Sequence, residues 1–190
     1  MREVCSMDIF KDFKKVCEVE EYTINKYKDM LPAELIAAWK IYGYGTFMNG
    51  YLKIINPDEY KSVVNDSFLR SEGTTPIFTT AMGDVILFEK DENQESYIVT
   101  INYRKGNTKV VASKYSLFLR FLEEEAFKQK ALDWSPYPEA MEKYQEPEYE
   151  ECFGYTPLLG VGGEEKVDHL KKVNLKEHIL NITEFMGPVE

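Results

Sequence analysis

The fold is predicted from residues 76–112, which have the sequence PIFTTAMGDVILFEKDENQESYIVTINYRKGNTKVVA. It holds four short runs rich in β-branched and aromatic residues, and turn-forming residues such as Gly83-Asp84 separate them. Connections this short join antiparallel strands, because parallel neighbours need long crossovers, so the stretch predicts an antiparallel meander. The predicted strands cover residues 76–80, 85–89, 97–103 and 109–112.

Helical periodicity surrounds this meander on both sides. One apolar stripe begins after Pro32 and stops at Gly43 and Gly45, where the backbone can leave the helix. Asn56 and Asn174 are good N-cap residues for two further helices. Helices are therefore predicted over residues 7–17, 32–42, 57–68, 114–122 and 175–186, with a short strand over 51–55. The predicted fold class is α+β: a central antiparallel β-meander flanked by helices, with a helical C-terminal portion packed on it.

Composition narrows the class of protein. The chain has 190 residues and a formal net charge of −10, with no apolar run near the roughly 20 residues that cross a bilayer. Its first residues carry charge throughout and lack the apolar core of a signal peptide, so we expect a cytoplasmic protein without a membrane partner. A nucleic-acid partner is not expected either, because phosphate binding needs positive charge. An acidic surface is typical of solubility or of encounter with a basic partner.

Few residues suggest catalysis or ligand binding. The three cysteines, Cys5, Cys17 and Cys152, lack the spacing of a zinc site or a disulfide framework, and we expect reduced, buried thiols. His169 and His178 have no metal or nucleophile motif beside them, and we expect exposed or capping roles. The sequence therefore predicts no catalytic residue, no cofactor and no metal site. A small enzyme that uses paired carboxylates stays open as an alternative.

The segment from Trp134 to Glu151 is the candidate partner-binding surface. Tyrosine and tryptophan are frequent anchors of binding hot spots, and clustered acids suit a basic partner. The alternative is that these aromatic residues pack the two halves of the chain together. The candidate partner-binding residues are Trp134, Tyr137, Tyr144, Glu146, Glu148, Tyr149, Glu150 and Glu151.

Two motif-bearing regions resemble known families. The stretch WKIYGYGTFMNGYL, residues 39–52, followed by INPDEY, residues 55–60, resembles the GAD-like domain family of bacteria, and TAMGD, residues 80–84, matches that family's turn between strands. The stretch ECFGYTPLL, residues 151–159, with Gly162-Gly163, resembles the C-terminal module of type VI secretion immunity proteins. A more distant similarity is to the SUKH superfamily of contact-toxin immunity proteins.

The resemblance implies a GAD-like α+β domain over residues 1–122 and an immunity-type module over residues 123–190, packed together as one compact unit. It implies a cytoplasmic immunity protein that binds and neutralises a cognate toxic effector, typically a nuclease, delivered by a bacterial secretion system. Nuclease clefts are basic because their substrate is polyanionic, so an acidic inhibitor suits them. The alternative in the same class of non-catalytic proteins is a regulatory or scaffold module that binds a housekeeping protein.

Overall fold

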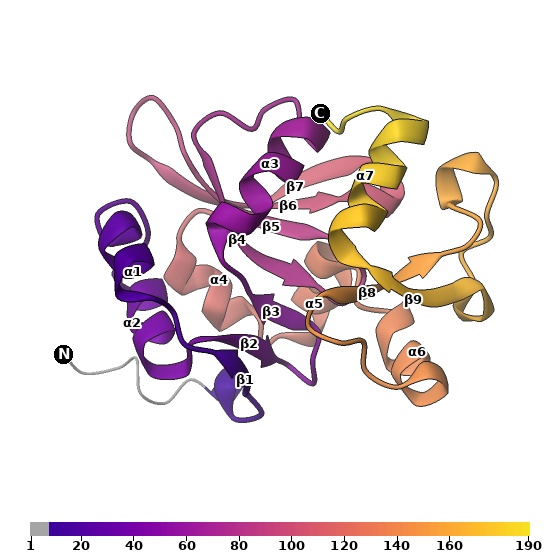
Figure 1. Ribbon diagram of the computed structural model, residues 1–190, viewed down its shortest axis with the longest axis horizontal. Coiled ribbons are helices and arrows are strands. Elements are labelled where there is room, and N and C mark those ends of the chain that lie inside the picture. The colour runs from indigo at the N-terminus through magenta and orange to yellow at the C-terminus, as the bar shows by residue number, and fades with distance from the viewer. Residues whose placement is uncertain (1–7) are drawn as a thin grey trace.

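The computed structural model describes residues 8–190, and its centre is a seven-stranded sheet in which each strand pairs antiparallel with the next along the chain (Figure 1). The four strands predicted from residues 76–112 are present as β4 to β7, so the predicted meander is confirmed. The strands are β1 (Lys14–Cys17), β2 (Tyr44–Phe47), β3 (Leu52–Ile54), β4 (Thr74–Thr80), β5 (Val85–Lys90), β6 (Ser96–Asn102) and β7 (Asn107–Ala112).

Helices cover both faces of this sheet, and the two helix starts predicted from asparagines are confirmed. The Asn56 side chain accepts a hydrogen bond from the Asp58 N–H, and the Asn174 side chain accepts one from the Glu177 N–H. None of the helices in residues 8–190 has the length and apolar character to cross a membrane. The helices are α1 (Glu21–Tyr27), α2 (Ala33–Tyr42), α3 (Pro57–Ser67), α4 (Tyr115–Phe121), α5 (Glu125–Leu132), α6 (Pro136–Tyr144) and α7 (Leu175–Met186).

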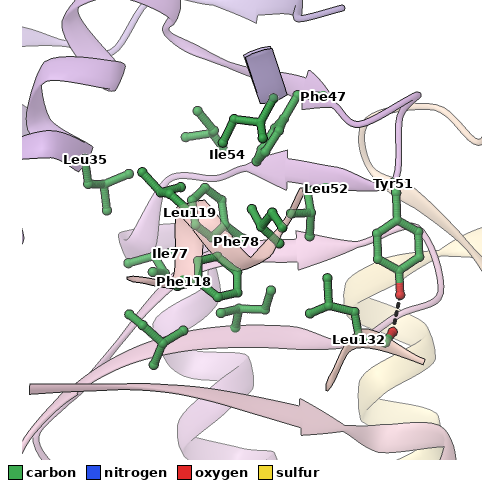
Figure 2. Packing of buried hydrophobic residues seen from close by; sticks show 14 of the residues in the cluster. Leu35, Phe47, Tyr51, Leu52, Ile54, Ile77, Phe78, Phe118, Leu119 and Leu132 are labelled. Carbon is green, nitrogen blue, oxygen red and sulfur yellow. Dashed lines mark hydrogen bonds between the residues drawn. The ribbon is translucent and has the colours of Figure 1, made fainter. Parts of the chain in front are cut away.

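Each face of the sheet has its own apolar core. On one face α2 and α4 pack Leu35, Phe118 and Leu119 against Phe78 and other sheet residues, as Figure 2 shows. On the other face α3 and α7 cover β5 and β6. Strand β6 supplies alternate residues to this second core, with Val99 and Ile101 buried.

The C-terminal portion packs on this frame and is only partly helical. After α6 the chain forms a two-stranded antiparallel hairpin, β8 (Glu151–Tyr155) and β9 (Leu170–Asn174), which leads into α7. Three single turns of 3-10 helix complete the fold after β6: η2 (Tyr103–Lys105), η3 (Leu159–Val161) and η4 (Val167–His169). The α+β fold class is therefore confirmed, with a small hairpin added to the predicted C-terminal helices.

The helix predicted over residues 7–17 is wrong within the described residues, and residue 7 lies outside them. A 3-10 turn, η1 (Asp8–Phe10), precedes β1 instead. Phe10 and Phe13 do lie on one apolar side, but both pack against the Tyr42 ring, with centroids 4.8 and 5.2 Å away. After this turn the chain forms β1 and pairs with β2. The helix prediction failed because an apolar pair three residues apart fits a turn as well as a helix.

Candidate partner-binding surface

The predicted partner-binding segment lies along the end of the sheet where β2 turns into β3. Tyr137 is only 1% exposed, and its hydroxyl donates a hydrogen bond to the Asn49 carbonyl at 2.6 Å. Its ring lies 5.0 Å from the ring of Tyr51. The Tyr51 hydroxyl in turn donates to the Leu132 carbonyl (Figure 2). Tyr137 therefore joins the C-terminal portion to the sheet.

The other three predicted aromatic residues are half-buried and make the same kind of contact. The Trp134 ring lies 4.5 Å from the ring of Tyr51, and the Tyr144 ring lies 6.3 Å from that of Phe153. The Tyr149 hydroxyl donates to the Ile54 carbonyl on β3 at 2.7 Å. Trp134, Tyr137 and Tyr149 thus pack the C-terminal portion against the sheet, whereas the contact of Tyr144 lies within that portion. Such packing is the alternative that the sequence left open, and a role of the four residues in partner binding stays a prediction.

The predicted glutamates divide into two structural and two exposed residues. Glu146 is half-buried, pairs with Lys14 on β1 and accepts a hydrogen bond from Thr46 at 3.4 Å. The Glu151 carboxylate accepts a hydrogen bond from the Glu148 N–H at 3.0 Å, which closes the loop before β8. The side chains of Glu148 and Glu150 are exposed and form no ion pair with residues 8–190. Of the four predicted glutamates, these two are the ones free to meet a partner.

The loop that carries these two acids is held from inside by Lys53, a residue that the sequence did not single out. Lys53 is fully buried on β3, and its ammonium donates to the carbonyls of Glu148, Tyr149 and Glu151 at 2.7, 3.0 and 2.5 Å. Burial lowers the pKa of Lys53 to about 8, while nearby acidic groups act in the opposite direction. Because the acceptors are backbone carbonyls, no side-chain motif in the sequence predicts this contact.

Lysines flank the exposed acids, so the surface alternates in charge. The Lys172 ammonium donates to the Glu146 carbonyl at 2.8 Å, and Lys176 on α7 pairs with Glu59 on α3 at 3.0 Å. A partner that contacts Glu148 and Glu150 would therefore meet both signs of charge. Such alternation favours specificity over strong long-range attraction.

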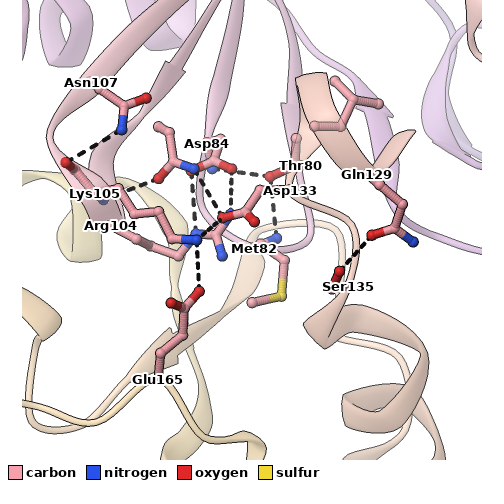
Figure 3. A network of polar contacts seen from close by, with 12 residues as sticks. Thr80, Met82, Asp84, Arg104, Lys105, Asn107, Gln129, Asp133, Ser135 and Glu165 are labelled. Atoms are coloured by element: carbon pink, nitrogen blue, oxygen red, sulfur yellow. Dashed lines mark hydrogen bonds and ion pairs between the residues drawn. The ribbon is translucent and has the colours of Figure 1, made fainter. Parts of the chain in front are cut away.

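An ionic network with a buried centre and an exposed rim joins the sheet to the C-terminal portion at a second place, shown in Figure 3. Arg104 in η2 pairs with Asp84 at 2.7 Å and lies 3.4 Å from Asp133, which follows α5. Lys105 bridges Asp133 and Glu165 at 2.8 and 2.7 Å. Burial raises the pKa of the Asp84 carboxyl, and the Arg104 guanidinium opposes that rise. Asp84 and Asp133 thus both contact Arg104, a cation of the protein itself. Such an arrangement of carboxylates is typical of a contact that stabilises the fold.

His178 lies beside this network, and the prediction that it is exposed or capping is wrong. It is 7% exposed on α7, and its ring packs against Gly154 so closely that a Cβ there would lie 2.5 Å from the ring. Burial, with a smaller effect of Arg104, lowers the pKa of His178 to about 4. The ring is therefore neutral at pH 7. His169, by contrast, is half-buried at the end of η4.

The prediction of buried thiols is confirmed for Cys152 and wrong for Cys17, which lies on the exposed edge strand β1. Cys17 and Cys152 are both free, the first exposed and the second buried, and Cys5 lies outside the described residues. Burial raises the pKa of the Cys152 thiol to about 12. Residues 8–190 contain no group of three or more His, Cys, Asp or Glu side chains placed to hold a metal ion.

Comparison with known proteins gives matches along most of the chain. The family described as GAD-like domain matches residues 5–103, and the family described as T6SS immunity protein Tdi1, C-terminal, matches residues 112–186. No curated protein matches the chain.

A solved structure shares the fold. The crystal structure of Atu4351 from Agrobacterium tumefaciens has a TM-score of 0.74 at 16% sequence identity, and the match covers 97% of this chain and 89% of that one. At such low identity the likeness shows the fold alone. The domain boundary at residue 122 stays a prediction. From these matches, the chain belongs to the GAD-like domain family, and the part that follows is similar to the C-terminal domain of the type VI secretion immunity protein Tdi1.

Proposed function

We propose that this protein is an immunity protein, which binds a cognate effector of a type VI secretion system and blocks its toxicity. The observation that carries the proposal is the match of residues 112–186 to the C-terminal domain of an immunity protein. The action is binding rather than catalysis. The buried Asp84 carboxylate supports this, because it is engaged by Arg104 instead of facing an open pocket.

The contact surface that we propose includes the exposed acids of the loop before β8. Lys53 holds this loop from inside through three carbonyls, so the outward side chains of Glu148 and Glu150 are presented on a fixed backbone. The buried aromatic residues of the same segment act indirectly, by fixing α6 and the loop on the sheet. The proposed surface is therefore smaller than the set of residues that the sequence suggested.

The proposed effector is a nuclease with a basic substrate cleft, acting in the cytoplasm where its nucleic acid lies. The chain carries 33 acidic and 23 basic side chains, and its net charge of −10 would accelerate encounter with a basic protein. The fold suits occlusion of a cleft, since the loop that carries Glu148 and Glu150 is short and is held against β3 by Lys53.

Co-expression with the effector encoded beside this protein tests the function. Growth rescue by the intact chain is expected, and failure to rescue, with both proteins present in soluble form, would remove the proposal. An effector that kills without degrading nucleic acid, but is still neutralised, would keep the immunity function and remove the nuclease.

Charge reversal tests the surface separately. Glu148→Lys with Glu150→Lys should slow association with the effector about tenfold at low salt, with a smaller effect at high salt, because screening weakens the interaction between exposed charges. The matched control is Glu123→Lys with Glu124→Lys, an equal charge change at exposed residues between α4 and α5. Equal association rates for the two variants would place the interface elsewhere.

A further inference from the structure

A small cavity lies where α7 meets η2 and the chain that follows β8. Its volume is about 10 Å³, and its walls include the apolar side chains of Leu158, Ile182 and Met186. Arg104, His178 and Tyr155, which carry polar groups, also line it. His178 belongs to the region matched to the immunity domain, and Arg104 directly follows the region matched to the GAD-like domain. The cavity therefore lies between these two regions.

Arg104 and His178 each have one nitrogen that needs a partner. Arg104 uses Nε and Nη2 on Asp84, while Nη1 is buried and has no hydrogen-bond partner among residues 8–190. The Nε2 atom of His178 is buried and lacks a partner in the same part of the chain. A buried polar group without a hydrogen bond costs about 1–3 kcal/mol, and more when it is charged. Because both residues line the same cavity, one partner inside it could satisfy both nitrogens.

The chemistry of the two nitrogens defines that partner. A guanidinium has only donors, and a neutral imidazole has one donor nitrogen and one acceptor nitrogen. If Nε2 is the acceptor, the partner must accept from Arg104 and donate to His178. A halide accepts but cannot donate, whereas water does both. The cavity volume also matches the roughly 10–15 Å³ that one water molecule requires.

We infer that this cavity is a binding site for a single water molecule, which accepts a hydrogen bond from Arg104 Nη1 and donates one to Nε2 of His178. The proton of the imidazole is then on Nδ1. Gly154 is the residue that lets the ring reach this position, since a Cβ there would lie 2.7 Å from Nε2. The water links α7 to η2, so it fixes the C-terminal helix on the sheet through polar contacts as well as apolar ones. This inference is independent of what the protein binds.

A high-resolution crystal structure of the full chain at neutral pH tests the site directly. The expected result is one ordered density peak within about 2.7–3.2 Å of both nitrogens. A dry cavity, or a direct contact between Arg104 Nη1 and His178 Nε2, would overturn the inference. Crystals grown with sodium bromide in place of chloride give the second arm. Anomalous scattering at the peak would show an anion and would also overturn it.

Nitrogen NMR of the imidazole gives an answer that does not depend on crystals. The chain has only two histidines, so His169→Gln leaves His178 as the single imidazole signal. At pH 7 we expect a proton on Nδ1 and a free lone pair on Nε2. A proton on Nε2 would reverse the hydrogen bond and sink the proposed arrangement, even if a water molecule were present.

Discussion

Two cations are buried at the junction between the sheet and the C-terminal portion, and they find their partners in different places. Arg104 pairs with Asp84, which lies in the turn between β4 and β5, so the main part of its ion pair belongs to the GAD-like region. Lys53 donates to three carbonyls that all belong to residues 148–151. Without the C-terminal portion, Arg104 would keep Asp84, but Lys53 would lose every acceptor that the structure gives it.

This difference shows how the two matched regions depend on one another for stability. A buried ammonium without hydrogen bonds is strongly unfavourable, so the sheet with Lys53 in place is complete only when residues 148–151 close over it. The ionic network around Arg104 adds Asp133 and Glu165 to a pair that the sheet already holds. We therefore expect one cooperative folding unit, in which Arg104 stabilises the sheet and Lys53 stabilises the junction.

The largest effect is expected from Arg104→Met. This change leaves the Asp84 carboxylate buried and unpaired, which should lower the free energy of unfolding by about 3–5 kcal/mol in urea denaturation at pH 7. Asp84→Asn added to Arg104→Met removes the orphan charge and should restore part of the loss. A single variant within about 1 kcal/mol of the wild type would show that the pair is dispensable.

Acid should also destabilise the region around Arg104, through its neighbour His178. Its folded pKa of about 4 lies below the value of 6.5 expected for the unfolded chain. As pH falls from 6.5 towards 4, the unfolded chain binds the proton first, so stability is present above 6.5 and is lost in this range. The shift corresponds to about 3 kcal/mol.

The measurement for this acid effect is the free energy of unfolding of wild type and His178→Gln between pH 7 and 4. Carboxylates contribute to acid sensitivity in both proteins, so the informative quantity is the difference between the two curves. The wild type should lose more stability than the variant. Parallel curves would mean that His178 is accessible to protons in the folded state.

A smaller loss, about 2 kcal/mol, is expected from Lys53→Met. The variant leaves three carbonyls without their donor, but it also removes an ammonium whose burial is unfavourable, and these two effects oppose each other. Lys172→Met is the matched control, because Lys172 also donates to a carbonyl but from an exposed side chain. Similar losses for the two variants would contradict the proposed role of Lys53 at the junction.

Hydrogen exchange would locate the effect of Lys53→Met. We expect faster exchange in residues 148–155 and in β3, with little change in β6, because the lost hydrogen bonds connect only the first two segments. Arg104→Met should instead accelerate exchange around the β4–β5 turn and η2. If both variants loosened the same residues, the two cations would not serve different parts of the molecule.

The sequence predicts what local patterns determine and misses what only packing determines. The meander and the helix starts at Asn56 and Asn174 follow from alternation, short turns and N-cap chemistry, all of which act within a few residues. Phe10 and Phe13 show the limit of such patterns, because their spacing fits a helix but the partner ring of Tyr42 lies in another element.

The functional residues were harder to predict for a related reason. Tyrosine and tryptophan are used both as hot-spot anchors and as packing between layers, so composition cannot separate the two uses in residues 134–149. Lys53 and His178 depend on carbonyls and glycines from distant parts of the chain. Gly83 and Gly154 belong to the two different motif regions, and both lie near the His178 ring. Only the structure shows that these two distant glycines make room for the same side chain.

The smallest effect is expected from Lys14→Met, at the outer rim of the same junction. Lys14 pairs with Glu146, but its side chain is 65% exposed, and exposed pairs contribute only about 0–1 kcal/mol. We expect a loss below about 0.5 kcal/mol that vanishes in high salt, because mobile ions screen the pair. A loss as large as that of Lys53→Met would mean that the rim, and not the buried ammonium, holds the loop of Glu148 and Glu150 in place.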